Sequence, residues 1–348
     1  MRATVTVLTL TLFLLAARHA QAADDDTIRL KPSGSAVGTI SKMSSTEISL
    51  NMAAGQHRVI PVNEIETIMF AGEPAEMRQV RTHIGNGNYE NALNTLDKIA
   101  TMQLPREEVQ RDVKFYTALC RSRIALAGGG DIGKAGGLMR QFVNESTQNY
   151  HYLQAAEILG DLFAAFGRFD LAYEQYAHVE RAPWPDYKMR GGVAKGRVLA
   201  AQKKFPEALI AFEAVIKLAG DGPQGPAATQ KLAAELGKAI CLANTEQVDE
   251  GIKLVQQVIE AASPEDNELN ARAYLALGNC YKQKADSVKD ARDAFLHVDL
   301  LYFQNRELHA EALFNLAKLF NETGHPEDAS KATQVLRERY PGTVWAKN

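Results

Sequence analysis

The chain has 348 residues, of which 46% are hydrophobic and 23% are charged, so disorder over most of its length is excluded. Its net charge of −3 at pH 7 argues against nucleic-acid binding, which requires a basic surface. The 3 cysteines are far apart and odd in number, which excludes the disulfide framework of a small secreted domain. We expect them to be buried free thiols, with one disulfide as the alternative.

The first residues have the features of a secretory signal peptide. Arg2 supplies a positive start, residues 5–17 form an apolar run, and residues 20–22 are a cleavage site of the A-x-A type. The run is shorter than the roughly 20 residues that a transmembrane helix needs, and an uncleaved anchor is the alternative. We therefore expect the signal peptide to span residues 1–22 and the mature chain to carry no transmembrane segment. The expected location is the periplasm or cell envelope, or outside the cell.

Apolar and polar residues alternate from residue 27 to about residue 70, which is typical of strands with one buried face. The pattern predicts five strands, at residues 27–31, 37–41, 46–50, 57–60 and 64–68, of which 57–60 fits least well. We assign residues 23–72 to a small β domain, a meander or a barrel that resembles SH3-like or Sm-like domains in strand number. Its thin core favours packing against the first helices; a free edge that accepts a partner peptide is the alternative.

From residue 73 to residue 348 the pattern is helical, and in every second helix a small residue precedes an apolar one by four positions. These small residues predict about seven helix pairs; they are Ala92, Ala135, Ala172, Ala208, Gly251, Ala291 and Ala329. In the last of them, Thr333 stands where an apolar residue is expected. Two glycine-rich insertions, residues 128–130 and 220–226, are expected between helices.

Two of these pairs come close to the tetratricopeptide signature W-x2-L-G-x2-Y…A-x3-F…P. They read Tyr274-x2-Leu277-Gly278-x2-Tyr281…Ala291-x3-Phe295 and Leu159-Gly160…Gly167-x-Phe169-x2-Ala172-x3-Tyr176. Over roughly residues 74–345 the chain thus resembles the tetratricopeptide repeat (TPR) family. The resemblance implies a mainly α fold, a right-handed superhelix of helix pairs that stack into a continuous core. At the close helix crossings we expect small residues, with Tyr176, Phe212 and Phe295 filling the space between repeats.

The closing stretch, residues 336–345, is similar to repeats of bacterial periplasmic proteins tied to outer-membrane assembly and envelope maintenance. Outer-membrane assembly factors of that kind are typically lipid-anchored through an N-terminal cysteine. No cysteine follows the predicted cleavage site here, which argues against that specific role.

No segment carries a complete catalytic motif. Residues 128–135 read G-G-G-D-I-G-K-A and approach a P-loop, but Ala135 replaces the hydroxyl residue that binds Mg²⁺, and the preceding stretch reads as helix. The eight histidines lack the spacing of zinc ligands, and no serine lies in G-x-S-x-G. We therefore expect no catalytic residue, no metal and no cofactor.

The resemblance to TPR proteins also implies a binding surface. In that family the first helix of each pair lines a concave groove, and the residue after its small residue tends to face inward. The residues predicted to bind a partner are Asp161, Arg197, Lys238, Asn279 and Lys318, with Lys282 close to Asn279 on the same face. Three of the first five are basic, which favours an acidic peptide or a C-terminal carboxylate. A solvated helix face with no single role is the alternative.

The favoured function is a non-catalytic protein-protein interaction scaffold in the periplasm or cell envelope. Two other hypotheses remain: a cell-wall or polysaccharide hydrolase with the repeats as a recruiting frame, and a structural subunit of an envelope assembly that docks through the β domain. The hydrolase requires two carboxylates across a cleft, and the sequence picks out no such pair. The oligomeric state is not predicted.

Overall fold

The computed structural model describes residues 25–104, 106–222 and 225–347. These residues form two compact units. The first unit contains the described residues up to Cys120 together with Gln141–Tyr152, and the second contains Arg121–Arg140 and the described residues from Leu153 onward. The predicted signal peptide, residues 1–22, lies outside the described residues.

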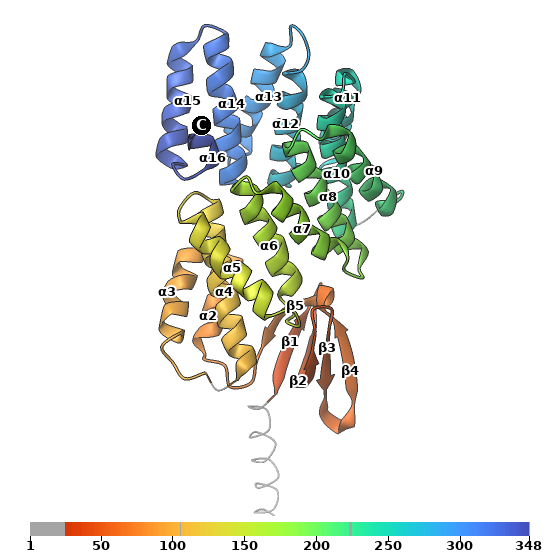
Figure 1. The fold of residues 1–348 in the computed structure, drawn as a ribbon, viewed down its shortest axis with the longest axis vertical. Coiled ribbons are helices and arrows are strands. Elements are labelled where there is room, and N and C mark those ends of the chain that lie inside the picture. Colours follow the sequence, from red (N-terminus) through yellow and green to blue (C-terminus); the bar gives the residue numbers. More distant parts are fainter. Residues whose placement is uncertain (1–24, 105, 223–224, 348) are drawn as a thin grey trace, which may run out of the picture. The chain divides into compact units, whose positions relative to one another are not determined.

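The first unit contains a five-stranded antiparallel sheet with the order β4-β3-β2-β1-β5 (Figure 1). The strands are β1 (Asp26–Leu30), β2 (Ser35–Met43), β3 (Glu47–Asn51), β4 (His57–Pro61) and β5 (Ile65–Met69). Strand β2 is longer than expected, because its first half pairs with β1 and its second half pairs with β3. The prediction of five strands in this region is confirmed.

One face of the sheet is closely packed. Five of its side chains are fully buried, namely Ile28, Ile48, Leu50, Ile60 and Ile68. In β4 only Ile60 is buried, which explains why the alternation is weakest there. Gly38 in β2 lies so close to the end of β3 that an added Cβ would lie 2.2 Å from the carbonyl oxygen of Asn51. A side chain at this position would push the two strands apart.

Asp26 ties the sheet to the helices of the first unit. Its buried carboxylate accepts hydrogen bonds from the backbone N–H of Ile40, at 3.0 Å, and of Ala71, at 2.9 Å. Arg106, just before α4 (Glu107–Leu126), completes the set with an ion pair of 2.6 Å. A buried carboxylate with three donors is well compensated, so the sheet and the helices of this unit are held together by a specific contact.

The remaining helices alternate along the chain as antiparallel pairs (Figure 1). The pairs are α2 (Glu76–Gly85) with α3 (Tyr89–Ile99), α4 with α5 (Ile132–Glu145), α6 (Tyr152–Ala165) with α7 (Phe169–Glu180), α8 (Pro185–Ala201) with α9 (Phe205–Ala219), α10 (Pro226–Ala243) with α11 (Val248–Ala261), α12 (Asn267–Tyr281) with α13 (Val288–Leu301), and α14 (Arg306–Glu322) with α15 (Pro326–Arg339). A short helix, α16 (Val344–Lys347), follows. Seven pairs are thus present among the described residues, as the repeat pattern predicts.

The small residues lie at the helix crossings. All seven predicted small residues are buried in the second helix of their pair. Across from them, the glycines of the first helices contact aromatic rings: an added Cβ would lie 2.5 Å from the ring of Tyr176 at Gly160, and 2.6 Å from the ring of Phe295 at Gly278. The expected role of these residues in close helix packing is confirmed.

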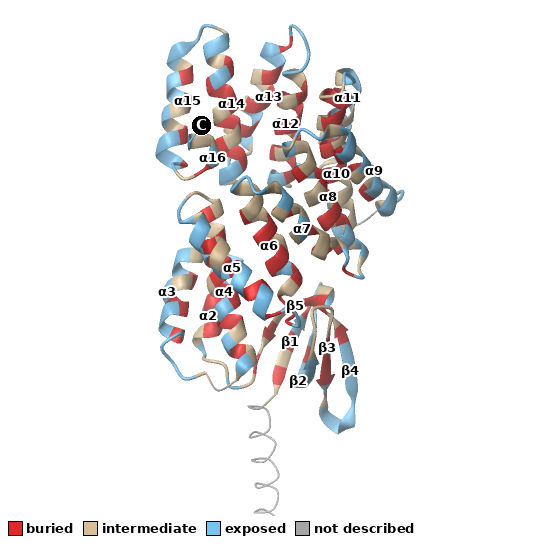
Figure 2. Ribbon diagram, viewed as in Figure 1, coloured by how far each residue is buried: buried red, intermediate tan, exposed pale blue. Residues whose placement is uncertain are grey.

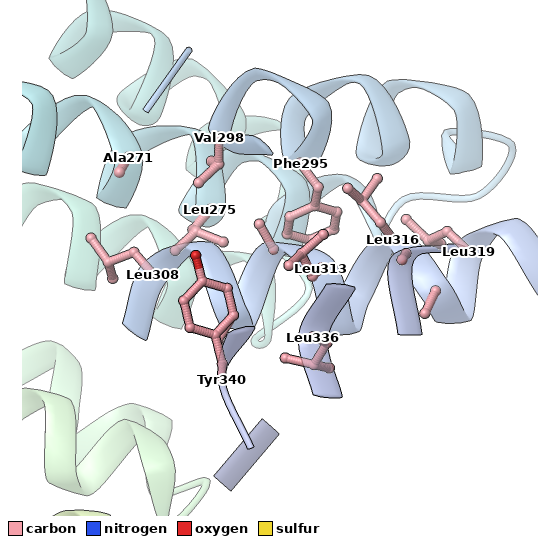
Figure 3. Packing of buried hydrophobic residues seen from close by; sticks show 14 of the residues in the cluster. Ala271, Leu275, Phe295, Val298, Leu308, Leu313, Leu316, Leu319, Leu336 and Tyr340 are labelled. Atoms are coloured by element: carbon pink, nitrogen blue, oxygen red, sulfur yellow. The ribbon is translucent and has the colours of Figure 1, made fainter. Parts of the chain in front are cut away.

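Within the second unit, the apolar faces of neighbouring pairs form buried clusters, and buried residues are red in Figure 2. Figure 3 shows the C-terminal cluster, where Phe295 from α13 and Leu313 and Leu316 from α14 pack together. Leu336 and Tyr340 close this cluster, and Pro341 is the second residue after the end of α15. Burial of apolar side chains between neighbouring pairs is the main source of stability in stacked repeats.

The first glycine-rich insertion lies between α4 and α5, as expected. In the second, residues 220–222 and 225 lie between α9 and α10, Pro226 begins α10, and residues 223 and 224 are outside the described residues. The first insertion makes a close contact within the second unit. Gly128, in the left-handed conformation with a φ of 84°, lies against the turn that follows α15. An added Cβ on Gly342 would lie 1.7 Å from the carbonyl oxygen of Gly128. Only glycine allows the two turns to approach so closely.

Cys120, Cys241 and Cys280 are free and buried. Burial raises the pKa of each thiol to about 12. These cysteines are therefore packing residues with little thiolate at neutral pH. Within the described part of the chain, no helix is both long enough and apolar enough to cross a membrane.

Candidate binding groove

A polar groove of about 270 Å³ lies on the first helices of the pairs in the second unit. Its charged residues come from α6, α8, α12 and the residue just before α12: Glu157, Asp161, Arg190, Arg197, Asp266, Glu268 and Arg272. We call this site the central groove. Four acids and three arginines share it, so it can bind charged groups of either sign.

Asp161 is positioned by the helix crossing beneath it. Because Gly160 lets the ring of Tyr176 pack against α6, the hydroxyl group of Tyr176 reaches Asp161 and donates a hydrogen bond of 2.8 Å. Burial, with a further contribution from Glu157, raises the pKa of Asp161 to about 6.

Two of the arginines are already paired. Arg190 forms an ion pair with Glu157 and lies 4.8 Å from the ring centre of Tyr187. Arg272 donates a hydrogen bond of 2.8 Å to Glu268, one turn earlier on the same helix. These contacts fix four of the seven charged side chains in the groove.

Arg197 is different. Among the described residues it has no hydrogen-bond partner and no ion-pair partner. It is exposed to the groove, yet the surrounding walls remove part of its hydration, and Arg272 repels it. Together these effects lower the pKa of Arg197 to about 10, at which it is still charged at neutral pH. An unpaired guanidinium offers up to five N–H donors to a ligand.

A second polar cluster adjoins Asn279. Asn279 lies near Glu311 of α14, while Lys282 at the end of α12 donates a hydrogen bond of 2.8 Å to Asn315. Burial, followed by the charge of Glu307, raises the pKa of Glu311 to about 7, and Asn279 offsets part of this rise. Lys318 lies further along α14, with its ammonium 4.0 Å from the ring centre of Phe314.

The structure therefore brings some of the predicted site residues together and separates others. Asp161 and Arg197 line the central groove. Asn279 and Lys282 lie in the cluster with Glu311. Lys238 is outside the groove lining and forms an ion pair of 2.9 Å with Glu213 on α9, so its charge is already partnered.

Sequence reasoning missed Glu157, Arg190, Glu268 and Arg272. Each lies four, seven or eleven residues before a predicted inward-facing residue on its own helix. Since these spacings are one, two and three helical turns, they return to the same face. Extending each predicted position by the helical period would have identified all four residues from the sequence.

The other candidate sites from the sequence give less support for a binding site. Residues 128–135 form a turn and the start of α5, and the preceding segment is the helix α4 rather than the strand that a P-loop requires. Trp184 lies just before α8, half-buried, with its ring 5.1 Å from that of Tyr187. Across the residues that the structure describes, no three His, Cys, Asp or Glu side chains are arranged to hold a metal ion.

Residues 311–343 match the family model described as tetratricopeptide repeat. This segment covers most of α14 and all of α15. No curated protein matches the chain.

The fold is similar to several solved structures. A tetratricopeptide repeat protein from Parabacteroides merdae is 14% identical with a TM-score of 0.53, over 78% of this chain and 98% of that chain. A Rap protein complexed with competence and sporulation factor is 14% identical with a TM-score of 0.54, over 78% and 76% of the two chains. The Rap conjugation regulator of plasmid pLS20, in complex with the Phr* peptide, is 13% identical with a TM-score of 0.50, over 76% and 74%. The chain therefore has the stacked helical fold of tetratricopeptide repeat proteins.

Proposed function

We propose that this protein is a non-catalytic scaffold that binds a segment of another protein in the central groove. The observation that carries the proposal is Arg197, an unpaired guanidinium in a groove whose other two arginines have carboxylate partners. Such a group favours a ligand carboxylate, because a charge-assisted bidentate contact is among the strongest hydrogen bonds in proteins. The preferred ligand is a peptide segment with an acidic side chain or a free C-terminus.

The peptide complex of the pLS20 Rap regulator supports this class of ligand, since that protein has a similar fold and binds the Phr* peptide. The groove geometry supports it as well. Because Glu157 and Glu268 hold Arg190 and Arg272 in place, the groove is largely preformed and costs little ordering on binding.

We further propose that the protein acts in the bacterial periplasm or cell envelope. The support is the sequence pattern of residues 1–22, a positive start, an apolar run and a cleavage site. A mild net negative charge after their removal fits a protein partner rather than nucleic acid.

The test is capture of partners from envelope extract by the wild-type protein and by Arg197→Ala, with retained proteins identified by mass spectrometry. Loss of a charged hydrogen bond is expected to weaken the specific partner by about tenfold or more. Arg181→Ala is the matched control, because Arg181 is an exposed arginine in the turn between α7 and α8. If Arg197→Ala and the control retain the same partners with the same affinity, the central groove is the wrong surface.

A further inference from the structure

Helix α9 exposes an apolar stripe. Ile210, Ala214 and Leu218 are spaced four residues apart, so they lie on one face of the helix. Ile210 is 68% exposed and Leu218 is 49% exposed, unusual values for large aliphatic side chains. The opposite face of α9 packs into the core through Ala208, Phe212 and Val215. This helix is therefore apolar on both sides, although one side faces solvent.

The stripe lines a groove of about 590 Å³. The remaining lining residues come from α7, α8 and α9, and Leu199 is the apolar one from α8. Tyr173 lines the α7 side, where Lys195 lies over its ring at 4.7 Å and forms an ion pair of 2.5 Å with Glu180. The groove thus has an apolar side on α9, and on α7 and α8 a lysine and a glutamate that neutralise each other.

Two charges on the groove remain available. Lys188 of α8 and Glu207 of α9 both line it, and among the described residues neither side chain has a hydrogen-bond or ion-pair partner. One is positive and one is negative. If two copies met at this surface about a two-fold axis, Lys188 of each copy could pair with Glu207 of the other.

We propose that this surface is a homodimer interface, in which α9 of one copy lies antiparallel in the groove of a second copy. Ala214 would lie at the two-fold axis, where its small side chain allows close helix approach. Ile210 of each copy would then contact Leu218 of the other. The surface is self-complementary because the same stripe lines the groove of its own copy and enters the groove of the other, as an isologous contact requires.

A second copy is favoured over an unrelated helix by this pairing of stripe and groove. A monomer would leave two large aliphatic side chains in water beside an open apolar groove, whereas a two-fold contact covers both at once. Free Lys188 and Glu207 add electrostatic complementarity that needs no other partner. This interface lies on different residues from the central groove, so the two proposals stand or fall separately.

The first experiment measures the mass of the purified protein by analytical ultracentrifugation over a range of concentrations. A dimer is expected for the wild type. Ile210→Glu places a charge in the contact and should raise the dimer dissociation constant by about tenfold or more. Leu300→Glu is the matched control, because Leu300 is 65% exposed on α13 and outside the proposed interface. Both sites are exposed, so both variants should fold, which circular dichroism checks.

A second experiment locates the axis. In Ala214→Cys the new thiols of two copies would face each other at the axis, and mild oxidation should give a disulfide-linked dimer. Ala285→Cys, exposed between α12 and α13, should stay monomeric on a non-reducing gel. The three native cysteines are buried and do not compete. A wild-type protein that stays monomeric up to ~0.1 mM overturns the proposal, as does a dimer that Ile210→Glu leaves intact. Capture of a different protein by a monomeric chain through this groove would also overturn it.

Discussion

Phe212 shows how the repeat glycines work at the level of single residues. Its ring is fully buried between α8 and α10, and glycines face it from both helices. An added Cβ would lie 2.6 Å from the ring at Gly196 and 2.2 Å from it at Gly237. The ring cannot move away from one helix without moving into the other, so both positions require glycine.

We therefore predict that Gly237→Ala destabilises the protein by about 1–3 kcal/mol, the usual cost of overpacking a core. Chemical denaturation of the wild type and the variant measures the difference. Gly136→Ala is the control, because an added Cβ there meets no atom within 4 Å and Gly136 lies inside α5. That substitution should stabilise the helix by about 0.5–1 kcal/mol. Equal effects of the two substitutions would contradict the proposed packing.

Asp161 predicts a pH dependence. The pKa of an aspartate in an unfolded chain is about 3.9, whereas burial raises the pKa of Asp161 in the folded protein to about 6. Between these values the unfolded state releases the proton while the folded state retains it. The stabilisation from Asp161 is therefore fully present below about pH 4 and is lost as the pH rises through about 6. Glu311, with a pKa of about 7, extends the same trend upward.

Asp161→Asn should reduce this dependence, because the amide does not ionise and its oxygen can still accept the hydrogen bond from Tyr176. The measurement is the free energy of unfolding at about pH 5 and about pH 8. We expect the loss of stability between the two pH values to be smaller in the variant than in the wild type. Glu174→Gln, at an exposed position on α7, serves as the control and should behave like the wild type. An unchanged pH dependence in Asp161→Asn would show that other groups dominate it.

At the scale of elements, the contact between Asp26 and Arg106 is the most specific link between the sheet and the helices of the first unit. Asp26 is fully buried, so removing Arg106 would leave a buried carboxylate with two backbone donors alone. We predict that Arg106→Ala lowers the free energy of unfolding by about 1–3 kcal/mol, the range for a charged hydrogen bond. In the variant, hydrogen exchange should show reduced protection of the backbone amides first in β1 and β2.

Arg111→Ala provides the comparison. Arg111 also forms a 2.6 Å ion pair, with Glu107, but that pair lies on the exposed face of α4. Exposed pairs of this spacing contribute about 0.5 kcal/mol or less, because solvent screens them. If the two substitutions cost the same, burial of Asp26 is not what gives the contact its strength.

The elements themselves could largely be predicted from the sequence. Alternation indicated the strands because one face of the sheet is buried, and it was weakest in β4, where only Ile60 is buried. The small residues indicated the second helix of each pair because a buried crossing leaves room for nothing larger. Lys238 shows the limit at this scale, since its local position does not reveal that Glu213 on the preceding pair neutralises it.

At the scale of the whole molecule, the central groove could be predicted only in part. Its charged residues come from α6, α8 and α12 and from Asp266 just before α12, and Glu157 and Arg272 are far apart in sequence. Their distances depend on how each pair rotates against the next, and small rotations add up over several pairs. Residue spacing along one helix predicts which way a side chain faces, but it does not predict which residue on another pair comes near it. The free guanidinium of Arg197 therefore became visible only in the structure.

The contact between Gly128 and Gly342 has a consequence for how this protein can change in evolution. Open repeat arrays gain or lose units easily, because each unit touches only its neighbours. Here two turns more than two hundred residues apart meet, with room only for glycine on each side. Duplication or deletion of one helix pair between them would displace one turn from the other and break the contact. The repeat number between these glycines is thus a fixed property of the fold, and new functions must arise by substitution rather than by change of length.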